Sequence, residues 1–199
     1  MKWIVRIFIV ALLLAGAGVA YFAMNYVYNK NTGFSEAQKM LYIKTGSSFE
    51  DVVRAASEQN IIKDLDAFKW LANKKKYIGK VRPGCYKIKK DMTNEQIVNL
   101  LRAGVQEPLK VTFNNIRTVE LLAGRIAAQL EADSTSLFSY LADSATASQY
   151  GFNSQNFISM FIPNTYEMYW NTTTEGFVKR MAREYKSFWN DKRKARPKN

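Results

Sequence analysis

The chain has 199 residues, one cysteine, no histidine, and a formal net charge of +12 from 29 basic and 17 acidic residues. The lack of histidine excludes Ser-His-Asp and Cys-His nucleophiles, histidine-ligated zinc and histidine general bases. Any catalysis must therefore use carboxylates, hydroxyls, Lys or Arg, and we expect neither a metal nor a cofactor.

The first predicted element is a helix that crosses a membrane. Residues 7–28 are mostly apolar, and about 20 such residues span a bilayer as a helix. Lys2 and Arg6 in the leading tip, 1–6, favour an N-terminus in the cytoplasm and the rest of the chain outside it. A cleaved signal peptide with Ala15-Gly16-Ala17 as the cleavage site is the alternative, but the apolar sequence continues past this site and favours an uncleaved anchor.

The positive charge bears on the partners of the chain. Outside a membrane it favours anionic lipid headgroups and acidic cell-wall polymers rather than nucleic acid. Much of it lies in three basic runs, at 74–76, 87–90 and 192–198. Solvated surfaces are an equally good interpretation of these runs.

A polar linker at 29–38 leads into a small α/β subdomain, which we place at 39–106. Alternating apolar and polar residues predict a strand at 40–44. A second strand is predicted at 85–88, after Pro83-Gly84. Cys85 lies in the second strand, where we expect a small buried side chain rather than a reactive thiol. The order strand, helix, helix, strand, helix predicts a binding module of about the smallest size that buries its own core.

Capping residues place the three helices of this subdomain. Ser48, followed by an acid three residues later, and Thr93 with Gln96 have the pattern of capping boxes. Asp64 can cap the helix between them. Gly104 is expected to end the last helix in a left-handed conformation.

A second region, 107–199, is predicted to begin a mixed α+β domain of catalytic type. Its first elements are a strand at 109–113 and a strongly amphipathic helix that starts at Thr118. Another helix is predicted at 136–142. The small polar residues at 143–155 predict a loop or short turns.

The last part of the chain is rich in aromatic residues. They are dense at 157–170, and a final helix starts at Thr174. Because little chain remains to cover this helix, we expect its apolar stripe to be exposed. The stripe consists of Phe177, Val178, Met181, Tyr185 and Phe188.

Four segments together resemble the endolytic murein transglycosylases, the YceG-like family. They are 43–49, 82–88, 100–104 and 161–167. The last, Phe-Ile-Pro-Asn-Thr-Tyr-Glu, is similar to the family's Phe-x-Pro-Asp-Thr-Tyr signature. With the anchor, and in this order, they extend the resemblance to about Trp189.

The resemblance implies a single-pass protein of the bacterial inner membrane, with most of the chain outside the cytoplasm. It implies a LysM-like subdomain that engages glycan, then a catalytic domain that cuts nascent peptidoglycan strands. In this family one Glu acts as general acid to the glycosidic oxygen and then as base to the muramyl 6-hydroxyl, which leaves a 1,6-anhydro end.

The chain departs from the family pattern in two ways. Asn164 stands where the family has Asp, and Ile158-Ser159 where it often has Glu-Gly. The family's catalytic Glu lies downstream in an Ile-Glu-x-Glu-Thr-like helix, beyond Asn199, so the resemblance transfers no catalytic residue. We therefore expect the front portion of a transglycosylase, truncated and inactive alone.

Four consecutive residues are the candidates for a substrate cleft. The general-acid interpretation of Glu167 relies on burial among aromatic rings, which raises a carboxyl pKa. A structural carboxylate among packed rings is the preferred interpretation. For the other three the alternative is a turn after Pro163. The candidates are Asn164, Thr165, Tyr166 and Glu167.

Two functions without activity remain open. The chain can be a complete membrane-tethered module that binds peptidoglycan or serves as a scaffold. It can also be an anchored regulator that binds a cell-wall synthase through its Tyr and Trp clusters.

Overall fold

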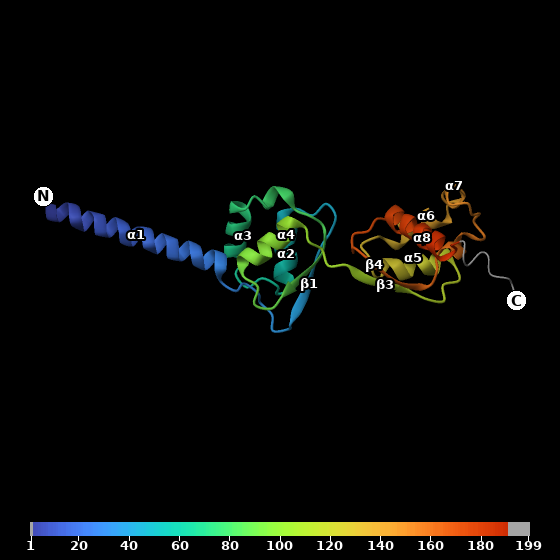
Figure 1. Cartoon of the computed structure of the whole chain (residues 1–199), viewed down its shortest axis with the longest axis horizontal. Coiled ribbons are helices and arrows are strands. Elements are labelled where there is room, and N and C mark those ends of the chain that lie inside the picture. The colour runs from blue at the N-terminus through green and yellow to red at the C-terminus, as the bar shows by residue number, and fades with distance from the viewer. Residues whose placement is uncertain (1, 191–199) are drawn as a thin grey trace. The chain divides into compact units, whose positions relative to one another are not determined.

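The computed structural model describes residues 2–190, so the basic run at 192–198 lies outside the described residues. The chain divides into two compact units, Met1–Gln106 and Glu107–Asn199, here called unit 1 and unit 2. Helices and short strands occur in both units (Figure 1). The described residues form eight α-helices and two two-stranded sheets, which confirms the predicted α+β class.

Helix α1, Lys2–Tyr28, is the long N-terminal helix of unit 1. Its segment Arg6–Tyr28 is long and apolar enough to cross a membrane, with a mean hydropathy of 2.4. Signal sequences also meet this criterion, so length and composition alone leave both predicted alternatives open.

The rest of unit 1 packs three helices against one antiparallel pair of strands. Strands β1 and β2 are antiparallel, with Leu41 opposite Tyr86. The segment predicted as a linker packs into this unit, because Asn31 is buried and Thr32 forms a β-bridge with Ile62. The elements are β1 (Gln38–Ile43), α2 (Phe49–Glu58), α3 (Leu65–Lys74), η1 (Ile78–Lys80), β2 (Gly84–Lys89) and α4 (Asn94–Ala103).

Local hydrogen bonds begin and end these helices as predicted. Ser48 and Thr93 both form complete capping boxes, at the starts of α2 and α4. The Asp64 carboxylate accepts a hydrogen bond from the backbone N–H of Ala67 and caps α3. Gly104 ends α4 with φ of 71°, a left-handed value.

The core of unit 1 lies between the two strands and the three helices. Phe49 stacks on Phe68 at 5.8 Å between ring centroids, and Tyr86 is fully buried against the same cluster. The Tyr86 hydroxyl donates a hydrogen bond of 2.9 Å to the carbonyl of Arg82. Cys85 is fully buried in β2, which confirms its predicted environment.

We predict that Gly84→Ala destabilises unit 1 by about 1–3 kcal/mol. Gly84 has φ of 143°, which L-residues rarely adopt, and a Cβ there would clash with the side chain of Gln106. Urea unfolding of the two proteins measures the loss. Gly79→Ala is the matched control, since no atom lies within 4 Å of its added Cβ; equal losses at both positions would contradict the explanation.

Unit 2 packs five helical segments over a two-stranded sheet. Leu109 pairs with Met168 and Phe113 with Asn164, so β3 and β4 are antiparallel. The elements are β3 (Leu109–Phe113), α5 (Val119–Ala127), α6 (Ser134–Ala142), α7 (Ser144–Gln149), η2 (Phe157–Met160), β4 (Asn164–Met168) and α8 (Thr174–Phe188).

Two aspartates extend the helical content of unit 2 beyond the prediction. Asp133 caps α6 through bonds to two backbone N–H groups, so this helix begins at Ser134. Asp143 does the same for α7, which occupies part of the segment predicted as a loop. The Thr146 hydroxyl and backbone N–H donate hydrogen bonds to the Asp143 carboxylate, and these bonds hold the pKa of Asp143 below its ordinary value.

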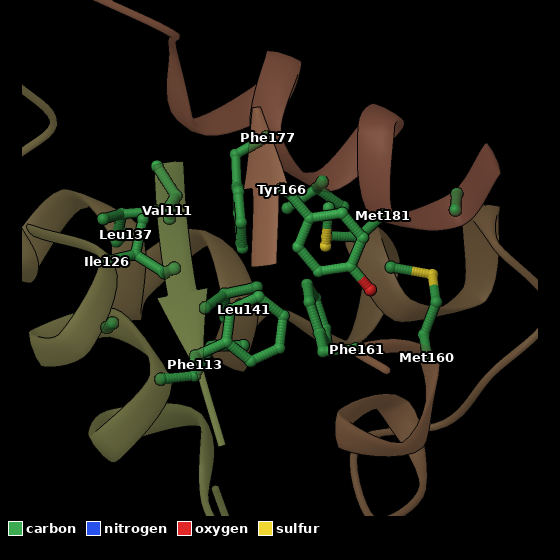
Figure 2. Close-up of a cluster of buried hydrophobic side chains, with 14 of the residues drawn as sticks. Val111, Phe113, Ile126, Leu137, Leu141, Met160, Phe161, Tyr166, Phe177 and Met181 are labelled. Carbon is green, nitrogen blue, oxygen red and sulfur yellow. The ribbon is translucent and has the colours of Figure 1, made fainter. Parts of the chain in front are cut away.

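The prediction that the apolar stripe of α8 is exposed is wrong for Phe177, Val178 and Met181, whereas Tyr185 is partly buried and Phe188 is 38% exposed. Figure 2 shows Phe177 and Met181 of α8 among the side chains of Phe113, Phe161 and Tyr166. Both α8 residues are fully buried. The strand pair and the aromatic segment before β4 cover the first part of the stripe, so these buried residues need no further segment to cover them.

Candidate functional site

Strand β4 carries the four predicted cleft residues. Alternation along the strand exposes Asn164, Thr165 and Glu167 and buries Tyr166. The alternative of a turn after Pro163 is wrong, because the segment pairs with β3 along its whole length. Whether these residues line a substrate cleft stays a prediction.

Tyr166 contributes its ring to the core of unit 2. The ring stacks on Phe113 at 5.6 Å, and the hydroxyl donates a hydrogen bond of 2.6 Å to the carbonyl of Ile162. Burial raises the pKa of this phenol, which therefore stays neutral. Tyr166 thus anchors the segment that precedes β4.

The exposed side of the sheet is polar. The hydroxyls of Thr112 and Thr165 lie 2.7 Å apart across the two strands. Gln129 binds both backbone groups of Thr112, accepting from its N–H at 2.9 Å and donating to its carbonyl at 3.0 Å. Lys110 stands opposite Glu167 in the register. The Gln129 contacts hold β3, and the pair of threonines joins β3 to β4, the strand that carries Glu167.

A hollow of about 450 Å³ lies beside Glu167, between the end of β4 and helix α8. Tyr169, on the chain just after β4, lines it and is 54% exposed. Arg180 and Arg183 of α8 also line it. Arg180 donates through Nε to Glu184 at 2.7 Å, which orients its guanidinium. We call this feature the β4–α8 hollow.

The chemistry of the β4–α8 hollow suits a polar ligand with carboxylates. An exposed tyrosine ring offers a flat apolar surface, as sugar rings require, with Glu167 as an acceptor beside it. The two guanidinium groups are donors that match carboxylate geometry. Among residues 2–190, no group of three side chains that ligate metals gathers here or elsewhere.

No carboxyl group is fully buried in the described part of the chain. The buried polar residues within 2–190 are Asn31, Asn94 and Thr146, so no carboxyl there is buried. Glu167 is exposed, so the burial on which its general-acid interpretation depended is absent. Hydrogen bonds from backbone N–H groups and hydroxyls lower the pKa of the carboxyls of Glu36, Asp51, Glu120, Asp133 and Asp143.

Sequence reasoning found one side chain of the β4–α8 hollow, Glu167, and missed the rest. A signal was present in α8: Gly176, Arg180 and Arg183 follow the i, i+4, i+7 spacing of one helical stripe. This stripe lies beside the apolar one and pairs a small residue with two basic ones. Tyr169 gave no such signal, since nothing in the pattern separates an exposed ring from a packed one.

Comparison with known proteins identifies the family of the chain. The sequence model of the YceG-like family matches residues 41–199, well over half of the chain. The protein is thus a two-unit α+β chain with an apolar N-terminal helix. It belongs to the YceG-like family, as predicted from the motifs.

One solved structure resembles part of the chain. The crystal structure of a YceG-like protein from Listeria monocytogenes aligns with a TM-score of 0.40 and 18% identity. The alignment covers 80% of this chain and 58% of the other, so the chain matches little more than half the length of that protein. A search of curated proteins finds no match.

Proposed function

We propose that the chain is the membrane-anchored front portion of an endolytic peptidoglycan transglycosylase. The observation that carries this proposal is the match to the YceG-like family over 41–199. Cleavage of nascent glycan strands, with 1,6-anhydromuramyl ends as products, then requires the family's catalytic Glu, and no Glu-x-Glu-Thr segment occurs in the 199 residues.

Helix α1 serves in this proposal as an uncleaved anchor in the bacterial inner membrane. Its hydropathy and length support insertion. Lys2 and Arg6 lie at the start of α1, which favours a cytoplasmic N-terminus and places the chain after about Asn29 outside. Unit 1 acts there as the LysM-like module that engages glycan near the membrane.

The β4–α8 hollow supplies a second glycan contact. The Tyr169 ring stacks on a sugar, while Glu167 accepts hydrogen bonds from sugar hydroxyls. Arg183 is exposed at the same hollow and pairs with carboxylates of the peptide stems. A strand bound here is oriented for the catalytic group of the transglycosylase.

A membrane-tethered glycan-binding module without activity is the second candidate. It is favoured by one observation, that residues 2–190 contain no buried carboxyl. General-acid catalysis near neutral pH needs a carboxyl with a raised pKa. A sugar-binding surface needs none.

We predict that the chain binds purified peptidoglycan sacculi in detergent but releases no anhydromuropeptides. Replacing the ring and the exposed cation together, with Tyr169→Ala and Arg183→Ala, is expected to weaken binding about tenfold. One aromatic contact accounts for about 1 kcal/mol and one exposed ion pair for about 0.4 kcal/mol, and about 1.4 kcal/mol corresponds to tenfold. Cosedimentation measures binding, and mass spectrometry of the digest identifies products.

Phe138→Ala is the matched control, since Phe138 is an exposed aromatic residue of α6 and does not line the hollow. Unchanged binding by the double variant would contradict the role of the hollow. Anhydromuropeptides from this chain would place an active acid within 1–199, with Glu167→Gln as the next variant. Adding the downstream segment from a family member and still finding no products would favour the tethered module.

A further inference from the structure

The end of helix α1 is built into unit 1 by hydrogen bonds. The carbonyl of Tyr26, in its last turn, accepts a hydrogen bond of 2.7 Å from Nδ2 of Asn94. The backbone N–H of Asn94 donates to the carbonyl of Asn29 at 3.0 Å. The Tyr26 ring lies edge-on to Trp70 of α3, with centroids 5.7 Å apart. These contacts therefore hold α3 beside the end of α1.

The length of α1 sets the depth of this junction. A helix rises about 1.5 Å per residue, so about 20 residues cross the roughly 30 Å of hydrocarbon in a bilayer. The apolar segment Arg6–Tyr28 provides that length and no large excess. Tyr26 and Tyr28 therefore lie at the interface, where aromatic rings are enriched. Trp70, in contact with Tyr26, lies at the same level.

The outer side of α3 has the composition of a surface that contacts lipid headgroups. Trp70 is 38% exposed, although it is a large apolar residue. Lys74 reaches over the Trp70 ring at 5.9 Å from the centroid. Lys69, the residue before Trp70, is exposed and lies 3.8 Å from the carboxylate of Asp66. Figure 1 shows α3 bordering the end of α1. The face combines an interfacial anchor residue with two cations.

A small hollow lies at the same junction. Its volume is about 200 Å³, and Lys30 and Lys63 line it together with the side chains of Asn25 and Asn29. Lys30 also pairs with Asp91 at 3.3 Å. The acidic residue in the lining is Asp64, and its carboxylate is engaged in capping α3. Two cations and two amides suit a phosphate group.

We propose that the α3 side of unit 1 rests on the bilayer and that this hollow receives the phosphate of an anionic phospholipid headgroup. This inference rests on the proposed membrane insertion of α1. Unit 1 is then held flat against the membrane surface and is not a freely rotating module on a tether. Glycan binding by unit 1 is thereby confined to strands close to the membrane.

The test places a single tryptophan at the junction. The full chain with Trp3→Phe, Trp170→Phe and Trp189→Phe retains Trp70 alone. It is reconstituted into vesicles of phosphatidylcholine, or of phosphatidylcholine with phosphatidylglycerol, that carry acyl chains brominated near the headgroup. We expect quenching of Trp70 in both, and stronger quenching with phosphatidylglycerol.

Charge variants test the cations directly. Lys69→Glu with Lys74→Glu, and separately Lys30→Gln with Lys63→Gln, should abolish the extra quenching by phosphatidylglycerol. Each lysine at an anionic surface is expected to change the ratio of docked to undocked modules roughly fivefold. Lys44→Glu with Lys186→Glu matches the first charge change on exposed residues outside α3 and the hollow, and should leave the quenching unchanged.

A companion variant that retains only Trp3 reports insertion of α1. If Trp3 is quenched and Trp70 is not, in either lipid, the docking proposal is overturned while the anchor stands. If neither is quenched and the chain does not float with the vesicles, both proposals fail. Equal quenching of Trp70 in the two lipids, unaffected by the lysine variants, would overturn the headgroup site.

Discussion

Phe177→Ala is expected to destabilise unit 2 by about 3–5 kcal/mol, the usual cost of removing a buried aromatic side chain. Phe177 is fully buried, stacks on Phe161 at 5.8 Å and lies edge-on to Phe113 at 6.4 Å. The two strands and η2 fix these neighbours, so the cavity cannot close by a small movement of one side chain. A loss of this size is a large fraction of the stability of a small domain.

The measurement is urea unfolding followed by pulse-labelling hydrogen exchange and mass spectrometry. Peptides from each unit report its own folded fraction, so the midpoint should fall for unit 2 and stay constant for unit 1. Phe188→Ala, on the same helix but 38% exposed, is the control and should cost less than about 1 kcal/mol. Similar losses for both variants would mean that α8 is not held by this cluster.

The helix caps were predictable from the sequence. The burial of side chains by segments distant in the sequence was not. The capping boxes at Ser48 and Thr93 and the left-handed Gly104 depend on residues three or four positions apart, so their patterns are visible in the chain. The burial of Phe177 depends on Phe113, which is far away in the sequence. No periodicity within α8 shows which segments lie against it.

The β4–α8 hollow illustrates the same limit at the level of function. Glu167 was singled out because it follows a family motif, yet its exposure follows from strand alternation opposite Lys110. Arg183 joins it because the chain turns between β4 and α8. That turn follows from the packing of unit 2, so the composition of the hollow was not readable from the sequence.

Helix α7 was missed for a different reason. It has six residues, Ser144–Gln149, which are too few to show helical periodicity, and three of them are Ser or Thr, whose intrinsic helix propensity is lower. The helix exists because the Asp143 carboxylate caps two N–H groups and because Ala147 is fully buried in the core of unit 2. A cap and one buried contact thus override a weak local preference.

Asn94→Ala is expected to destabilise unit 1 by about 3 kcal/mol, because its buried side chain makes three hydrogen bonds. Nδ2 donates to the carbonyls of Tyr26 and Ala67 at 2.7 and 2.8 Å. Oδ1 accepts from Asn31 at 3.2 Å. Alanine favours helices at this first position of α4, so the loss comes from the three severed bonds. The same urea titration measures it, read from unit 1 peptides.

The isosteric variant Asn94→Asp separates hydrogen bonding from volume. It leaves no cavity, but it points a carboxylate oxygen at two carbonyl oxygens in a buried site, so its loss should equal or exceed that of Asn94→Ala. Both variants should speed hydrogen exchange at residues 25–32, since Asn94 joins the end of α1 to α3. Asn73→Ala, an exposed asparagine of α3, should change stability by no more than about 0.5 kcal/mol. Wild-type stability in Asn94→Asp would show that the amide bonds contribute nothing, and the rigid junction at the membrane surface would lose its basis.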